Sequence, residues 1–149
     1  MTASAISSRQ GLTASWVAQM IGTIILCGAA LVLMRTIGKP LVDGDNDWKH
    51  YAAFGIIIGV APALLYLRWY KRILEQDLRL ERERGGVPEP VARRLLQKAL
   101  ALGGALCEIP MAMGVVQLLL GGETRWFLGA TMLTIALRLS YRPFTRRKR

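Results

Sequence analysis

Residues 103–122 read GGALCEIPMAMGVVQLLLGG and contain a single charged side chain, Glu108. The uncharged sequence on the N-terminal side of this stretch begins at Ala99, directly after Lys98. A helix needs about 20 apolar residues to cross a hydrocarbon layer of about 30 Å, and a chain inside lipid must pair its backbone polar groups internally. We therefore expect residues 99–122 to form a transmembrane helix.

Three further apolar runs have the same character and occupy residues 14–34, 51–67 and 126–141. The second run reads YAAFGIIIGVAPALLYL and contains Pro62, which removes one helical hydrogen bond and predicts a kink. With 52% hydrophobic residues in the whole chain, this pattern predicts an all-α integral membrane protein with a single membrane domain over residues 1–149. We expect its four transmembrane helices to form two antiparallel hairpins.

The connection between the two middle spans, residues 68–98, is rich in charged side chains. Glu75 and Arg79 are four residues apart, a spacing at which opposite charges attract each other on a helix. Gly85 and Gly86 then interrupt the helical pattern. We therefore expect the central pair of helices to extend past the membrane and to meet in a polar tip in the cytoplasm.

The basic residues are distributed unevenly along the chain, which has 20 Lys and Arg, 10 acidic residues and a net charge of +10. If the spans alternate in direction, sixteen of the 20 cations fall on one side: Arg9, nine within residues 68–98, and six from Arg138 onward. The positive-inside rule assigns that side to the cytoplasm. We expect a multi-pass protein of the bacterial inner membrane, with both termini cytoplasmic and no nucleic-acid partner.

Five basic residues near the C-terminal end are candidates for contact with anionic lipid headgroups at the cytoplasmic face, or with an acidic partner surface. They are Arg138, Arg146, Arg147, Lys148 and Arg149. Arg138 lies near the end of the last span. We expect its methylene groups to lie along the helix while its guanidinium reaches the headgroups.

Small residues mark two candidate surfaces for helix packing. Gly55 and Gly59 are four residues apart in the second span, and Gly103 and Gly104 are adjacent in the third. Small residues at these positions let two helices approach closely in a membrane. We expect these surfaces to pack against other helices, in a homo- or hetero-oligomer with other membrane subunits.

Glu108 is the residue that could carry chemistry, because a charged side chain at the bilayer centre costs about 2.5–3.5 kcal/mol on insertion scales. Burial favours the neutral acid, which could donate a hydrogen bond to Gln19, to Gln117 or to a carbonyl left unpaired by Pro110. An acid that exchanges its proton could instead bind an ion or carry protons. The sequence leaves both roles open.

The stretch Ala105-Leu106-Cys107-Glu108, followed by Met113-Gly114-Val115-Val116, resembles the ion-binding helix of the c-type or K-type proteolipid subunits of rotary ATPases. The resemblance covers residues 51–122, about half of the chain, and includes a glycine-bearing first helix and a polar loop. It implies a helical hairpin in which Glu108 would take up the ion.

Other kinds of site are missing from the sequence pattern. His50 is the only histidine, so a paired-histidine haem or a histidine metal cluster is excluded, although a single ligand to a pigment or haem stays open. No nucleophile is combined with a base, and Cys27 and Cys107 have no metal-binding spacing. We expect no enzymatic activity, metal or cofactor. The preferred function is a structural or accessory subunit of a membrane complex, and the alternative is ion or proton translocation through Glu108.

Overall fold

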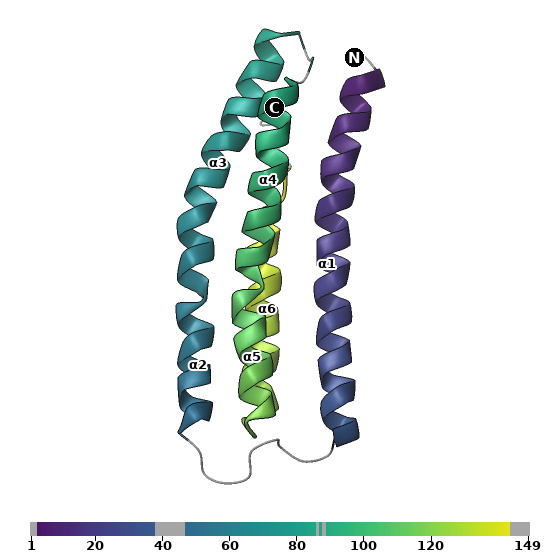
Figure 1. Ribbon diagram of the computed structural model, residues 1–149. Coiled ribbons are helices and arrows are strands. Elements are labelled where there is room, and N and C mark those ends of the chain that lie inside the picture. The colour runs from purple at the N-terminus through teal and green to yellow at the C-terminus, as the bar shows by residue number, and fades with distance from the viewer. Residues whose placement is uncertain (1–2, 38–46, 86, 88, 144–149) are drawn as a thin grey trace.

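The computed structural model describes residues 3–37, 47–85, 87 and 89–143, and all the regular structure within them is helical. The all-α class expected from the sequence is therefore confirmed. The elements are α1 (Ala3–Ile37), α2 (Trp48–Ile58), α3 (Val60–Glu83), α4 (Pro90–Cys107), α5 (Ile109–Leu119) and α6 (Thr124–Ser140). Helix α2 continues into α3, and α4 into α5, after one residue each, so the described part of the chain forms four rods (Figure 1).

The four rods run alternately up and down (Figure 1). The start of α1 and the turn between α3 and α4 lie at one end of the bundle, and the turn between α5 and α6 lies at the other. Helix α6 ends beside the middle of α3, short of the α3–α4 turn. Gly85 and Gly121 occupy these turns with φ of 65° and 80°, a backbone conformation that glycine adopts without a steric penalty.

The arrangement of the first rod differs from the two-hairpin plan. Helices α5 and α6 do form a hairpin, and α3 packs along α4. The main contacts of α1, however, are with α6, and it also touches α4 and α5. The physical reason lies in polar side chains of α1 that bond to α4 and α6, as described below. The pairing of the first span with the second is therefore not confirmed.

The two long rods are interrupted at the same level of the bundle. The first break is at Gly59, three residues before Pro62, and the second is at Glu108, two residues before Pro110. Proline disturbs a helix because it lacks an N–H and its ring clashes with the preceding turn. A Cβ on Gly59 would lie 2.8 Å from Cγ2 of Ile109 and 3.4 Å from the nitrogen of Pro110. Gly59 therefore allows the two breaks to lie side by side.

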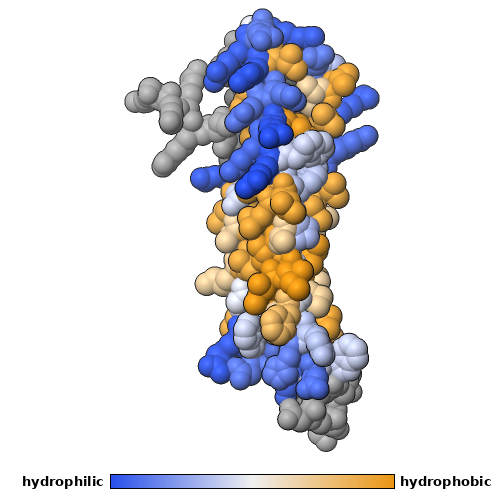
Figure 2. Space-filling model, turned by 90° about the vertical axis from the view of Figure 1, so that its left-hand side faces the viewer, coloured by the Kyte–Doolittle hydropathy of each residue, from blue (hydrophilic) through white to orange (hydrophobic). Residues whose placement is uncertain are grey.

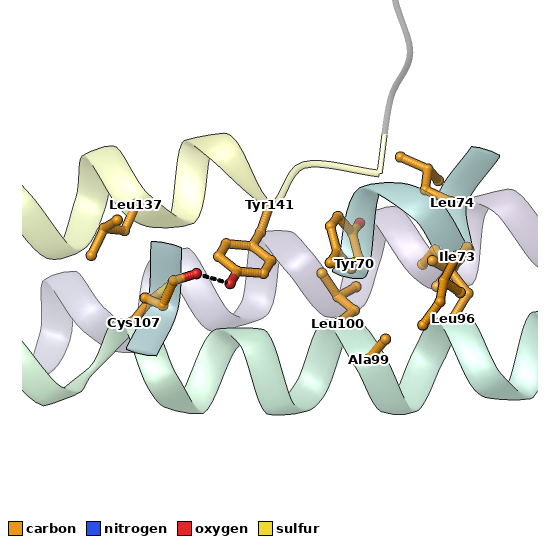
Figure 3. Close-up of a cluster of buried hydrophobic side chains, with 11 residues drawn as sticks. Tyr70, Ile73, Leu74, Leu96, Ala99, Leu100, Cys107, Leu137 and Tyr141 are labelled. Atoms are coloured by element: carbon orange, nitrogen blue, oxygen red, sulfur yellow. Dashed lines mark hydrogen bonds between the residues drawn. The ribbon is translucent and has the colours of Figure 1, made fainter. Parts of the chain in front are cut away.

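The main hydrophobic core lies between α3, α4 and α6 (Figure 3). Tyr70 and Tyr141 are each 1% exposed, and their rings are tilted with centroids 5.1 Å apart. The Tyr141 hydroxyl donates a hydrogen bond to the backbone carbonyl of Ala63, which links α6 to α3. A Cβ on Gly103 would lie 2.4 Å from the Tyr141 ring, so the absence of a side chain on α4 makes room for this tyrosine.

Three rods are long and apolar enough to cross a membrane: Gly11–Ile37, Trp48–Glu83 and Pro90–Leu119. On the face that Figure 2 shows, an apolar band crosses the middle of the molecule, with hydrophilic surfaces above and below it. Trp48 and Trp69 are 65% and 46% exposed. At 1.5 Å per residue they lie about 31 Å apart along their rod, which matches the spacing of the aromatic belts at the two surfaces of a bilayer. The chain thus has the dimensions of a membrane protein.

Candidate intramembrane polar site

Glu108 occupies the break between α4 and α5 and projects from the middle of its rod. Its backbone N–H bonds to the carbonyl of Ala105 at 3.1 Å, and its carbonyl accepts the N–H of Ala112 at 2.9 Å. Its backbone therefore stays bonded on both sides of the break. The break exists because Pro110 follows two residues later. The local sequence CEIP thus determines both the interruption of the helix and the position of the acid.

Side chains from three rods meet at the Glu108 carboxylate. The Arg138 guanidinium of α6 donates a hydrogen bond to Oε1 of Glu108 and forms a salt bridge with it. The Thr23 hydroxyl of α1 donates to the same oxygen at 2.9 Å. Nη1 of Arg138 also donates to Oε1 of Gln19 at 3.4 Å. We refer to Gln19, Thr23, Glu108 and Arg138 together as the intramembrane cluster.

Two further contacts hold α1 in place at this cluster. The indole Nε1–H of Trp16 donates to the backbone carbonyl of Arg138 at 3.0 Å. A Cβ on Gly104 would lie 2.4 Å from Oε1 of Gln19, so this glycine opens the space that the glutamine occupies. Apolar side chains of α1 also contact the bundle: Leu12 is 2% exposed in the main core, and Leu31 and Met34 pack against the second hydrophobic cluster. The face of α1 that packs against the bundle therefore combines polar and apolar side chains.

In the intramembrane cluster, the attraction between opposite charges offsets part of the free-energy cost of removing them from water. The side chains of Arg138 and Glu108 are 7% and 27% exposed, and Thr23 is 1% exposed. Moving a single charge out of water is costly, but opposite charges in contact offset much of the penalty for each other. Within the part of the chain that the structure describes, Oε2 of Glu108 and Nε of Arg138 have no hydrogen-bond partner. The cluster therefore keeps one unused acceptor and one unused donor.

Arg138 lies elsewhere than the sequence interpretation expected. Its guanidinium does not extend to the end of α6 but lies buried against Glu108. The connection between α5 and α6 is short, so positions at similar distances from that turn lie at the same level. Glu108 is about 16 Å from the end of α5, and Arg138 is about 21 Å from the start of α6. These two distances place both residues well inside the bundle, but the contact between their side chains depends on how the helices pack.

Glu108 therefore has a cationic partner in another rod, a partner that the sequence interpretation did not assign to it. That interpretation expected a neutral glutamic acid with Gln19, Gln117 or a free carbonyl as its partner. In the structure Gln19 bonds to Arg138. A Cβ on Gly122 would lie 2.0 Å from Nε2 of Gln117, which places that amide at the turn after α5.

The glycines singled out in the sequence all lie at close approaches within this chain. A Cβ on Gly55 would be 2.3 Å from the Cε atom of Met113, and the neighbours of Gly59, Gly103 and Gly104 are given above. These four positions therefore serve packing between helices of one molecule.

One remaining candidate, His50, lies outside the intramembrane cluster. His50 is exposed in the first turn of α2. Arg146, Arg147, Lys148 and Arg149 lie outside the described residues. Among the residues that the structure describes, no three His, Cys, Asp or Glu side chains gather as metal ligands would. Cys27 and Cys107 are free thiols, and Cys107 is buried.

Comparisons with protein-family models, with curated proteins and with solved structures find no match to this chain. The fold and the site therefore define its class by themselves. Within its described residues it is a small helical protein with three helices long and apolar enough to cross a membrane and a part-buried ion pair at the level of two helix breaks.

Proposed function

We propose that the chain is a non-catalytic integral membrane protein that serves as an accessory or structural subunit of a larger membrane assembly. The observation that supports this role most strongly is the pairing of Glu108 with Arg138 and Thr23. The guanidinium balances the charge of the carboxylate, and the threonine hydroxyl donates a hydrogen bond to it. Such a pair can hold helices together without exchanging protons. The cluster then acts as a joint between α1, α4 and α6.

The proposed topology has four spans, with both termini and the tip between α3 and α4 in the cytoplasm of a bacterial inner membrane. Two features support it: the sixteen-to-four bias of basic residues, and the direction of the rods, since the start of α1 and the tip lie at one end of the bundle and α6 runs toward that end (Figure 1). Helix α6 has 17 residues and would be the fourth and shortest span.

The topology can be tested by thiol labelling. In a variant in which Cys27 and Cys107 are replaced by Ala, a cysteine is introduced at Leu80 near the tip. A membrane-impermeant maleimide added to intact cells should leave this cysteine unlabelled and should label it once the inner membrane is permeabilised. Labelling of intact cells would place the tip outside and would contradict the topology.

Helix α1 offers the surface that a partner subunit would contact. Ile24, Ile25 and Leu26 are 58%, 64% and 56% exposed, and Val32 and Leu33 are 64% and 53% exposed. These side chains cover more than one face of the helix, since successive residues point 100° apart. Lipid or a neighbouring transmembrane helix would cover them in the membrane.

The subunit role predicts that the chain co-purifies with defined partners in a mild detergent. The test is affinity purification of the tagged chain at native abundance, followed by size separation under native conditions. We expect a complex of fixed composition larger than the 16.5 kDa chain. The proposal would be contradicted if the wild-type chain were recovered as a lone monomer of the same size as the variant Ile25→Arg, in which the exposed surface of α1 is changed.

Ion or proton translocation is the second candidate, and it rests on the unused Oε2 of Glu108 and on the break in the helix beside it. The variant Glu108→Gln separates the two roles because the amide oxygen can still accept from Arg138 and Thr23 but cannot titrate. For a subunit, assembly should survive this change nearly intact. If vesicles with the wild-type chain conduct ions or protons and vesicles with the variant do not, translocation is favoured instead.

A further inference from the structure

An open groove of about 540 Å³ lies between the middle of α3 and the end of α6. The α3 side provides Lys71 and Glu75, and the α6 side provides Ser140 and Arg142. The floor includes Tyr70, which is 1% exposed. The groove is separate from the intramembrane cluster and joins two segments of the chain that are distant in sequence.

The groove lies at the level where the apolar band ends. Lys71 follows the exposed Trp69 by two residues, and Trp69 marks the boundary of the hydrocarbon layer in the span that begins at Trp48. Figure 2 shows hydrophilic side chains gathered directly above the apolar band on this side of the molecule. A ligand in this groove would therefore sit in the headgroup layer.

The lining of the groove has a net positive charge and several hydrogen-bonding groups. Two cations, Lys71 and Arg142, face one acid, Glu75. The Ser140 hydroxyl donates to the carbonyl of Ala136 and keeps its lone pairs available. Within the described part of the chain, the buried hydroxyl of Tyr70 has no hydrogen-bond partner. A phosphodiester would accept hydrogen bonds from the two cations, and the Ser140 oxygen could accept a hydrogen bond from a ligand hydroxyl.

Apolar side chains continue from the groove toward the membrane centre. Leu139 lines the groove and is 45% exposed. Met132 and Leu128 lie seven and eleven residues before it, on the same face of α6, and are 72% and 45% exposed. This stripe provides a surface along which an acyl chain can lie below a headgroup held in the groove.

We propose that the groove binds an anionic glycerophospholipid whose headgroup is a phosphoglycerol. The phosphate contacts Lys71 and Arg142, the glycerol hydroxyls donate to the carboxylate of Glu75, and one acyl chain follows the stripe on α6. This site depends on the membrane placement made in the proposed function but not on the subunit role. A failure of lipid binding would therefore leave the co-purification test unaffected.

Native mass spectrometry of the delipidated full-length chain, titrated with lipids of identical acyl chains, tests the proposal. Wild type should bind one phosphatidylglycerol more tightly than phosphatidylethanolamine or phosphatidylcholine. The double variant Lys71→Gln/Arg142→Gln should bind phosphatidylglycerol about 25-fold more weakly, since each cation near the membrane surface contributes about fivefold. Equal affinity of wild type for the three lipids would overturn the assignment of an anionic headgroup.

The matched control is Arg72→Gln/Arg79→Gln, which removes the same charge from exposed positions of α3 outside the groove lining. Its affinity for phosphatidylglycerol should stay within about twofold of wild type. An equal loss in both double variants would show general attraction between opposite charges and would overturn the site.

Two more measurements address the location of the site and the source of the phosphate. Ser140→Trp fills the groove from an exposed position without changing charge, and it should abolish tight binding. Inorganic phosphate should not displace the lipid at millimolar concentration, because it makes no contact with the apolar stripe. Retained binding by Ser140→Trp, or displacement by inorganic phosphate, would overturn the lipid site.

Discussion

The molecule contains two buried ionic clusters, one inside the apolar band and one at the hydrophilic tip. In the tip, Arg93 of α4 lies 3.3 Å from Asp77 and 3.5 Å from Glu81, both of α3. All three side chains are at most 9% exposed. The tip cluster therefore joins the two rods of one hairpin, at the end of the molecule that lies beside water.

The intramembrane cluster has a different architecture. It joins three rods, and its bonds connect residues 30 and 85 positions apart in the chain. Hydrocarbon around it offers no replacement partner to a group that loses its own, whereas water can hydrate the tip. The comparison indicates that the same Arg–carboxylate chemistry aligns one hairpin in the tip but determines the position of separate helices in the membrane.

The largest effect is expected from Arg138→Leu, which leaves Glu108 without its cation in a low-dielectric setting. Breaking a buried pair from one side costs about 3–5 kcal/mol. We expect this loss in the free energy of unfolding, measured by denaturant titration in mixed detergent micelles. The control is Arg125→Leu, because Arg125 pairs with Glu123 while 86% exposed and should change stability little. Equal losses in the two variants would show that burial does not distinguish the pairs.

A smaller effect is expected from Arg93→Gln in the tip. Breaking a buried pair from one side costs about 3–5 kcal/mol, and we expect a value near the lower limit because water can hydrate Asp77 and Glu81 when the tip opens locally. Hydrogen–deuterium exchange should increase around the turn between α3 and α4 and stay unchanged at Glu108. An equal rise in exchange throughout the bundle would show that the tip cluster stabilises more than the hairpin of α3 and α4, contrary to this comparison.

The smallest of the three effects is expected from packing alone, without charge. Gly103→Ala places a methyl group 2.4 Å from the Tyr141 ring. Overpacking of a tight core typically costs about 1–3 kcal/mol. We expect a value near the lower limit, because Ala favours a helix over Gly by about 1 kcal/mol. Gly129→Ala is the control, since nothing lies within 4 Å of that position. It should raise the midpoint of thermal unfolding, and Gly103→Ala should lower it. A rise in both variants would contradict the packing described at Tyr141.

Much of the fold could be predicted from the sequence because it depends on local composition. Uncharged runs near 20 residues long predict helices in lipid, and Gly85 predicts the turn of the central hairpin, which the structure places between α3 and α4. The helices Trp48–Glu83 and Pro90–Leu119 run past the expected spans into the tip. The sequence does not predict the break at Glu108, although Pro110 predicts the loss of nearby backbone hydrogen bonds.

Within the candidate site, the sequence identified Glu108 as the unusual residue but not its partner. Arg138 was assigned to the headgroups because it stands near the end of a short span, where an isolated helix would let it extend toward water. That inference treats each helix alone. In the bundle, the turn after α5 brings α6 back along α4, and the guanidinium forms a salt bridge with the carboxylate instead.

The sequence by itself determined that the chain is helical, that it has membrane-spanning dimensions and that an acid lies inside an apolar span, because helix formation and transfer into lipid depend on neighbouring residues. Only the tertiary structure decided that α1 packs mainly on α6, that Glu108 bonds to Arg138 and Thr23, and that Lys71 and Arg142 share a groove. These contacts join residues far apart in the chain. They depend on how the helices pack, which no local pattern specifies.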